Sequence, residues 1–201
     1  MGTLRTERVG PALGLAAITA AFIGIFGAVL LSPSFAWSEN ALSNLGVTDH
    51  AAGTGTTVLL FNGGLILGGL LGVGFAVTLA LRVEPLLARL GAGLFGIAMA
   101  SMAGVGVFPQ GHSLHFPVAA GLYLLFSVAS IVYAGGLALN NNRRGALVSA
   151  ALGVANLAIW IGWVSTVGID APGLAIPEIL GAACIGTWVL WQVTWLRQRA
   201  E

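Results

Sequence analysis

The feature that most constrains the fold of this chain is an apolar run of about 20 residues that recurs along its 201 residues. A helix rises about 1.5 Å per residue, so roughly 20 residues cross the hydrocarbon layer of a membrane. Strands of outer-membrane barrels are short and alternate in polarity, whereas these runs are apolar on every face. The sequence therefore predicts an all-α polytopic membrane protein with six transmembrane helices in an antiparallel bundle, at residues 9–31, 55–81, 86–107, 117–139, 145–168 and 174–196.

Composition agrees with this assignment, because 57% of the residues are hydrophobic and only 7% are charged. Such values lie outside the range of soluble globular domains. No internal repeat is visible, so we treat residues 1–201 as a single six-helix transmembrane domain. The first run follows two arginines but is too long for the apolar core of a signal peptide, and we expect it to be a retained membrane anchor.

The cations predict the orientation of the bundle. All eight are arginines, and with six spans every one of them falls on the same side. The positive-inside rule assigns that side to the cytoplasm, which predicts a multi-pass protein of the cell membrane with both termini cytoplasmic. These arginines are Arg5, Arg8, Arg82, Arg89, Arg143, Arg144, Arg197 and Arg199.

The first outer connection, residues 32–54, is the longest loop and contains the segment WSENALSNLG. We expect this segment to form a short interfacial helix with Ser38 as its N-cap and Gly46 at its end. Leu42 and Leu45 would then lie on an apolar face that packs against lipid or against the bundle.

Small residues predict where the helices approach one another. Gly64, Gly68 and Gly72 recur at intervals of four in the second span, which is typical of a face that packs closely in a membrane. Asn156 near the middle of the fifth span is expected to make an interhelical hydrogen bond. Tryptophans near the ends of the last two spans are expected to be interfacial anchors, namely Trp160, Trp163, Trp188, Trp191 and Trp195.

No Asp, Glu, Lys, Arg or His lies in the middle of a span, which argues against a proton-coupled transporter or pump. The arginines are spread thinly over short segments, which excludes a nucleic-acid-binding surface. Gly-rich phosphate loops and nucleophile elbows are absent in the required context. The polar chemistry of the chain must therefore lie in the loops.

All three histidines fall on the outer side, together with four carboxylates. His112 and His115 with Glu39 or Glu178 could form a catalytic centre acting on a lipid, and the two histidines with a carboxylate could bind zinc. The alternative is that the stretch FPQGHSLHFP is a helix-to-helix connection, and that Glu178 caps the last helix. We expect no cofactor.

We expect the long loop to fold over the mouth of the bundle, with Asn62 beneath it and the histidines beside it, forming a small polar pocket. The leading hypothesis is that this pocket binds a lipid headgroup or a partner, with a homo-oligomer left open. A lipid-modifying hydrolase or transferase is the alternative, and a channel or facilitator is a weaker one. The expected ligand-binding residues are Asn40, Ser43, Asn44, Asp49, His50, Asn62, His112 and His115.

Three short motifs carry a resemblance to a known family. NALSNLG at Asn40, FNGGLILGGLL at Phe61 and FPQGHSLH at Phe108 resemble the six-span family catalogued as domain of unknown function number 998, which is found in archaea and bacteria. The chain is more distantly similar to the DRAM and Frag group of membrane proteins. The first resemblance implies a shared set of polar residues on the outer face and no particular activity.

Overall fold

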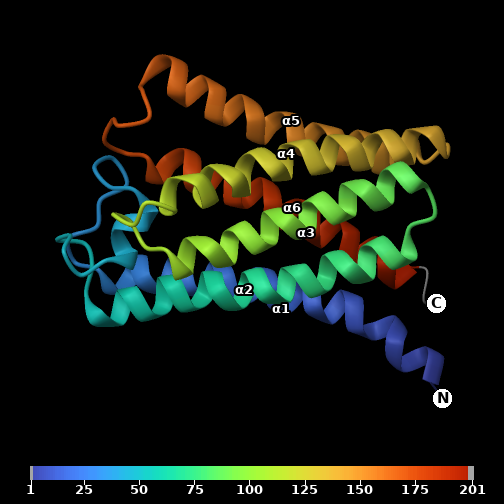
Figure 1. The fold of residues 1–201 in the computed structure, drawn as a ribbon, viewed down its shortest axis with the longest axis horizontal. Helices are drawn as coiled ribbons and strands as arrows, with labels where there is room; N and C mark the ends of the chain where they lie inside the picture. Colours follow the sequence, from blue (N-terminus) through green and yellow to red (C-terminus); the bar gives the residue numbers. More distant parts are fainter. Residues whose placement is uncertain (1, 199–201) are drawn as a thin grey trace.

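The computed structural model describes residues 2–198, with side chains from Val9 onward, and it contains six long helices and one short 3-10 helix. Figure 1 shows the long helices running side by side along the molecule, each antiparallel to the one before it. Their bounds are α1 Gly2–Leu31, α2 Gly55–Arg82, α3 Leu86–Val107, α4 His115–Leu139, α5 Arg143–Thr166 and α6 Ala175–Gln198, with the 3-10 helix η1 at Leu42–Gly46.

All six helices are long and apolar enough to cross a membrane, which confirms the six predicted spans. The helix that differs most in length from its predicted span is α1, which begins at Gly2, whereas its apolar span covers Val9–Leu31. α1 begins and α6 ends at the same end of the bundle (Figure 1). This is what an even number of crossings requires.

Glycines bring neighbouring helix backbones into contact. A Cβ added at Gly64 would lie 2.7 Å from the Cα of Gly24 on α1, and one at Gly68 would lie 2.9 Å from a carbonyl oxygen of α1. Gly72 departs from the predicted single face, because its Cβ would meet Met99 on α3 instead. On the other side of α3, a Cβ at Gly91 would lie 2.5 Å from the backbone nitrogen of Tyr133 on α4. Small residues therefore set the close packing of the first four helices.

A cluster of aromatic rings fills the centre of the bundle. Phe95 packs against Trp188 with ring centroids 4.7 Å apart, and Phe126 and Tyr133 contact the same indole. Trp188 is fully buried, and its Nε1 donates to the Ser149 hydroxyl over 3.1 Å. Its prediction as an interfacial anchor is therefore wrong, because this position of α6 faces the other helices and not the lipid.

The long loop packs on the end of the bundle and carries η1. Its ends are joined by a hydrogen bond from the Ser32 hydroxyl to the carbonyl of Ala52, at 2.7 Å. The helical part is shorter than predicted, and Ser38 is not its N-cap, because the Asn40 side chain accepts from the amide of Ala36 and forms a turn first. All five residues of η1 are buried, so this segment belongs to the core and not to the lipid surface.

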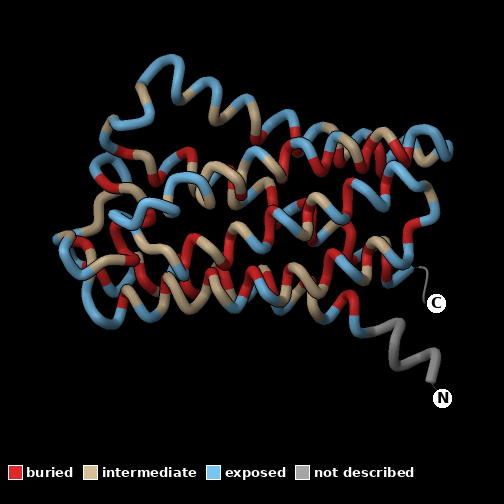
Figure 2. The backbone as a smooth tube through the Cα atoms, viewed as in Figure 1, coloured by how far each residue is buried: buried red, intermediate tan, exposed pale blue. Residues whose placement is uncertain are grey.

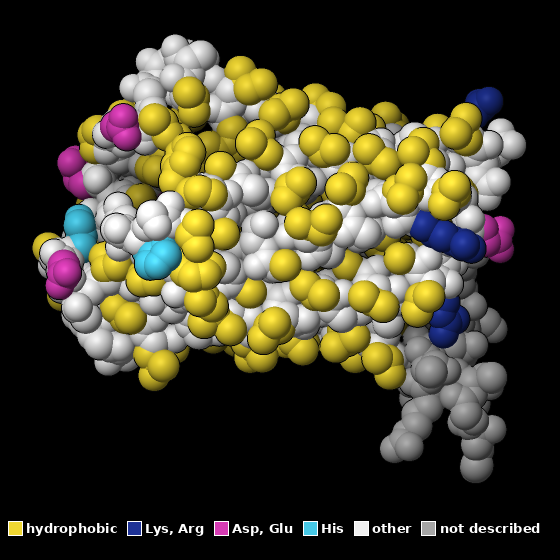
Figure 3. Space-filling model, viewed as in Figure 1, with side chains coloured by type: hydrophobic (Ala, Val, Ile, Leu, Met, Phe, Trp, Pro, Cys, Tyr) yellow, Lys and Arg dark blue, Asp and Glu magenta, His cyan; other side chains and the backbone are white. Residues whose placement is uncertain are grey.

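The two ends of the bundle carry different side chains, as Figure 3 shows. We call them the arginine end and the histidine end. By the bounds of the helices, the described arginines of the arginine end are Arg82, Arg89, Arg143, Arg144 and Arg197, while the histidine end carries His50, His112 and His115 with Glu39, Asp49 and Asp170.

Candidate functional site

A pocket of about 930 Å³ lies at the histidine end, bordered by α4, α5, the start of α6 and the loop that carries η1. Figure 3 shows the surface hollowed in this region, beside the part of α5 nearest the histidine end. The pocket exists because α5 packs closely on α4 only at the arginine end and leans away from it toward the histidine end (Figure 1).

The sequence of α5 explains why it leans. Its buried residues all lie between Gly145 and Asn156, and all five have small or amide-bearing side chains on one face: Gly145, Ala146, Ser149, Gly153 and Asn156. Farther along that face come Trp160 and Trp163, whose rings are too large for the same close approach. No residue of α5 beyond Asn156 is buried, as the exposed half of this helix in Figure 2 shows.

One end of the pocket is polar and is formed largely by η1 and the residues facing it. The Glu178 carboxylate, in the first turn of α6, accepts from the amide of Leu42 at 2.6 Å. Glu178 thus lies in the first turn of α6, as predicted, and its carboxylate also caps η1. Asn44 accepts from the amide of Ala41 through Oδ1 and donates through Nδ2 to the Gln110 side chain at 2.6 Å.

Ser43 is a buried residue whose side chain lines the pocket without a hydrogen-bond partner. The residue is 6% exposed. Among the described residues its hydroxyl makes no hydrogen bond. Because the side chain lines the pocket, this hydroxyl is available to a polar atom of a bound molecule.

His115, the first residue of α4, is held in one orientation. Its Nδ1 lies 2.8 Å from the carbonyl oxygen of Phe108. A carbonyl only accepts, so Nδ1 carries the proton, and in the neutral ring Nε2 is then an acceptor. The ring is half-buried and lines the pocket, so it offers this second nitrogen to a ligand or to a proton transfer.

Tyr123 and Trp160 form the part of the pocket where α4 and α5 still touch. Their ring centroids are 4.7 Å apart, and the Tyr123 hydroxyl donates to the carbonyl of Glu178 at 3.1 Å. The indole Nε1 of Trp160 is buried and has no hydrogen-bond partner. Asn156, one turn before Trp160, donates through Nδ2 to the Tyr123 carbonyl and the Ser127 hydroxyl, which confirms the predicted interhelical hydrogen bond.

A second, smaller cavity of about 70 Å³ leads from this region toward the middle of the bundle. Its walls are apolar and include Phe75 and Met99. The two cavities share one group of lining residues, which are Ser43, His115, Ala119, Tyr123 and Glu178. The polar end of the pocket therefore lies between the open groove and the apolar interior.

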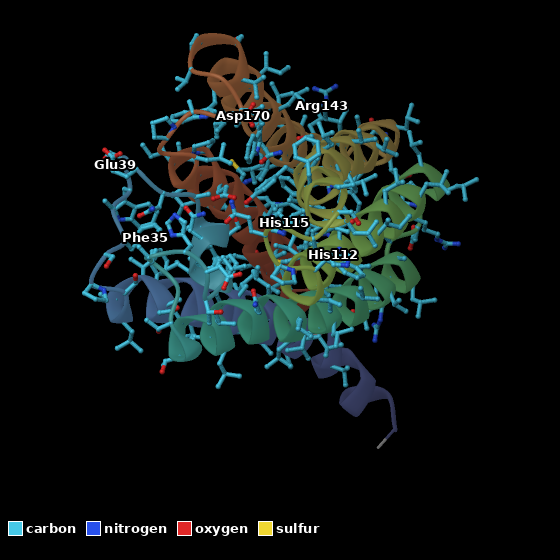
Figure 4. The ribbon with its side chains drawn as sticks, turned by 60° about the vertical axis from the view of Figure 1, so that its left-hand side comes forward. Phe35, Glu39, His112, His115, Arg143 and Asp170 are labelled. Carbon is cyan, nitrogen blue, oxygen red and sulfur yellow. The ribbon has the colours of Figure 1, made fainter. Side chains whose placement is uncertain are left out.

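The structure distributes the predicted site residues over three kinds of position. Glu39, Ser43, Asn44, His115 and Glu178 line the pocket together. Figure 4 shows that Glu39 and His115 come from different segments around it, with Asp170 on a third.

Other predicted residues make hydrogen bonds that hold the loop itself. Asn40 accepts from Ala36, and its carbonyl accepts from the amide of Ala175. His50 accepts from the amide of Ala52 through Nδ1. Asn62 lies beneath the loop as predicted, where Nδ2 donates to the carbonyl of Gly46 at 2.9 Å, but it does not line the pocket.

His112 and Asp49 are exposed and lie outside the pocket. The His112 ring packs on Phe108 with centroids 4.9 Å apart, and its Nδ1 accepts from the amide of Leu114. Among residues 2–198, no three His, Cys, Asp or Glu side chains come together in a way that could hold a metal ion. The structure thus does not bring the two histidines and a carboxylate together as zinc ligands.

The pocket residues that the sequence reasoning missed include Gln110, Tyr123, Trp160 and Asp170. One signal could have found Tyr123, because His115, Ala119 and Tyr123 are spaced four apart and so share one face of a helix. No comparable signal exists for Asp170, which follows α5 and reaches the pocket only because α5 leans away.

The comparisons with known proteins agree with the resemblance carried by the motifs. The family described as "Protein of unknown function (DUF998)" matches residues 15–195. The chain belongs to this family. No curated protein and no solved structure gives a match.

Proposed function

We propose that this DUF998 protein binds a single membrane lipid in the pocket between α4 and α5. The observation that carries the proposal is the make-up of the pocket, which joins a polar end at η1 to an apolar wall along two membrane-spanning helices. A lipid has the same division, with a polar headgroup next to acyl chains. The headgroup would lie against Ser43, Asn44 and His115, and an acyl chain would lie along the wall.

The apolar wall favours a lipid over a soluble ligand. Leu124 on α4 and Ile161 and Val164 on α5 line it, and each is about half exposed in the isolated chain. In a membrane these side chains face hydrocarbon, so an acyl chain in the groove remains continuous with the surrounding lipid. A water-soluble ligand would have to cross the headgroup region to reach the same surface.

Fluorescence quenching tests the proposal, because Trp160 lines the groove. A lipid with brominated acyl chains would be added to the detergent-solubilised protein at about one molecule per protein. We expect saturable quenching that is largely lost in Trp160→Phe and retained in the control Trp191→Phe, whose ring lies at the arginine end over Arg144. Quenching that does not saturate, or that both variants lose equally, would contradict lipid binding at this site.

An outer-face lipid hydrolase or transferase is the second candidate, and one observation favours it. The bond from His115 to Phe108 leaves Nε2 as the ring nitrogen able to accept a proton in the pocket. For hydrolysis, Nε2 would take a proton from water as the water oxygen adds to an ester carbonyl, and would return it to the leaving alkoxide as the ester C–O bond breaks. Glu39 or Glu178 would be the accompanying carboxylate.

Mass spectrometry of lipids incubated with the protein distinguishes the two functions. An enzyme would form product with the wild type and with His112→Gln, and would form none with His115→Gln. Intact lipid recovered from all three proteins would leave binding as the function. The third hypothesis, a channel, is not supported by the structure. Aromatic rings packed around Trp188 fill the middle of the bundle, where a pore would have to pass.

We also propose that the arginine end faces the cytoplasm of the cell and the histidine end faces outward, as the positive-inside rule predicts. Single cysteines at exposed positions 112 and 141, in a Cys184→Ser background, would be treated in intact cells with a membrane-impermeant maleimide. We expect labelling of His112→Cys alone. Labelling of Asn141→Cys alone would show that the orientation is the reverse of the one proposed.

The distant likeness to the DRAM and Frag group stays a prediction.

A further inference from the structure

The pocket is lined by carboxylates but by no arginine side chain among the described residues. These carboxylates are those of Glu39, Asp170 and Glu178. The described arginines lie at the opposite end of the bundle (Figure 3). An anionic headgroup would therefore enter a site whose fixed charges are negative, apart from any proton on His115.

The three carboxylates differ in how they are engaged. Glu178 already accepts from the amide of Leu42, whereas Glu39 and Asp170 are exposed. They come from the two loops that border the pocket, the one before η1 and the one between α5 and α6 (Figure 4). The free negative charge is thus at the rim, and Ser43, buried and unpartnered, lies deeper.

Aromatic rings in the pocket also favour a positively charged group. Trp160 and Tyr123 line the pocket and pack at 4.7 Å. The faces of indole and phenol rings attract cations, and they attract quaternary and primary ammonium groups in particular. The rim carboxylates and these aromatic faces lie in different parts of the pocket, and each favours a cationic group over an anionic one.

On the basis of the proposed function, we infer that the bound lipid has a zwitterionic headgroup ending in an ammonium group. The ammonium lies at the rim with Glu39 and Asp170, and the Ser43 hydroxyl donates to a phosphate or ester oxygen deeper in the pocket. Opposite charges at the rim favour this headgroup, and like charges disfavour an anionic one. The apolar wall favours a lipid with acyl chains over a free amine, which has none.

Native mass spectrometry of the full chain tests this inference. The protein would be incubated with equimolar phosphatidylethanolamine and phosphatidylglycerol of identical acyl chains, and the lipid retained on the protein would be counted. We expect a preference for phosphatidylethanolamine of about tenfold or more, a typical size for a difference of one or two charge contacts. Equal retention, or a preference for phosphatidylglycerol, would overturn the ammonium assignment and leave lipid binding intact.

Variants locate the preference in the pocket. Glu39→Gln with Asp170→Asn removes both rim charges at exposed positions, and we expect the preference to fall to nearly one. Glu84→Gln at the arginine end is the matched control and should keep it. Ser43→Ala should reduce the retention of both lipids by a similar factor and leave the ratio between them unchanged. If the double variant keeps the preference for phosphatidylethanolamine, the rim carboxylates do not bind the ammonium group.

Two further outcomes separate this inference from the function on which it rests. Free ethanolamine, which has the ammonium without acyl chains, should fail to displace the lipid at equal concentration. Displacement would overturn the commitment to a lipid. If neither phospholipid is retained by the folded wild-type protein, the proposed function itself fails, which is a different result from retention without preference.

Discussion

The two halves of α5 differ in the size of the side chains that face the rest of the bundle. In the half near the arginine end, a Cβ at Gly153 would clash with the Ser130 hydroxyl of α4 and lie 3.0 Å from the Ser127 carbonyl oxygen, so the helices are in backbone contact. In the other half, a Cβ at Gly162 would meet nothing within 4 Å, and Trp160 holds α4 and α5 apart. A gradient of side-chain volume along one helix can therefore close one end of a bundle and open the other.

The two halves also differ in how their polar groups are satisfied. In the closed half, the Ser149 hydroxyl accepts from Trp188 and lies 3.5 Å from the Gln192 amide, whose Oε1 accepts from the Tyr133 hydroxyl. In the open half, the indole nitrogens of Trp160 and Trp163 are buried and unpartnered. The closed half leaves one buried acceptor unpartnered, Asn156 Oδ1, and of the two unpartnered indoles of the open half only that of Trp160 lines the pocket. Trp160 Nε1 is therefore the donor that the open half keeps for a ligand.

The largest effect should come from filling the closed half. We expect Gly153→Leu to destabilise the protein by about 3 kcal/mol or more, because the new side chain must displace backbone and side-chain atoms of α4. Gly162→Leu in the open half is the control and should be neutral or slightly stabilising, since glycine disfavours a helix interior by about 1 kcal/mol. Thermal unfolding in detergent measures both. Equal losses would show that the open half is as tightly packed as the closed one.

The next effect concerns the polar end of the pocket. Glu178→Ala removes the side chain that accepts from the buried Leu42 amide, and we expect a loss of about 1–3 kcal/mol, which is typical of a buried donor left without an acceptor. The loss should be local, with faster amide hydrogen exchange across Leu42–Gly46. Glu39→Ala, at an exposed position nearby, should leave that exchange unchanged. Unchanged exchange in Glu178→Ala would mean that the carboxylate does not hold η1.

A smaller effect distinguishes two serines of α5. Ser149→Ala should cost about 1–2 kcal/mol, because the buried indole nitrogen of Trp188 loses its acceptor. Ser165→Ala should cost almost nothing, since that hydroxyl is exposed and bonds only within its own turn. Chemical unfolding and the fluorescence of Trp188 report the difference. A neutral Ser149→Ala would show that the closed half tolerates an unpartnered donor as the open half does.

The smallest effect is expected beneath the loop. Asn62→Ala removes the hydrogen bond to the carbonyl of Gly46 and should cost about 1 kcal/mol or less, as for other hydrogen bonds between membrane-embedded segments. Lipid retention should be nearly unchanged because Asn62 does not line the pocket. The exposed Thr56→Ala is the control. Abolished lipid retention in Asn62→Ala alone would place the ligand near α2 and not between α4 and α5.

Parts of the site were predictable because they depend on local signals. Ser43, Asn44 and His115 were expected from their position in a polar loop or beside one, and they line the pocket. Asn40 and His50 gave the same signal, yet their side chains bond to backbone amides of the loop. A polar side chain in a loop can satisfy itself or serve a ligand, and residue type does not distinguish the two.

The sequence by itself determined the six crossings and the segregation of arginines from histidines, because the length and polarity of a membrane span are properties of each segment alone. Only the tertiary structure decided that Glu178 meets the amide of Leu42, 136 residues away, and that Trp160 lies on Tyr123. These contacts depend on how closely distant helices approach. That approach is set by side-chain volumes on both partners together, so neither segment predicts it separately.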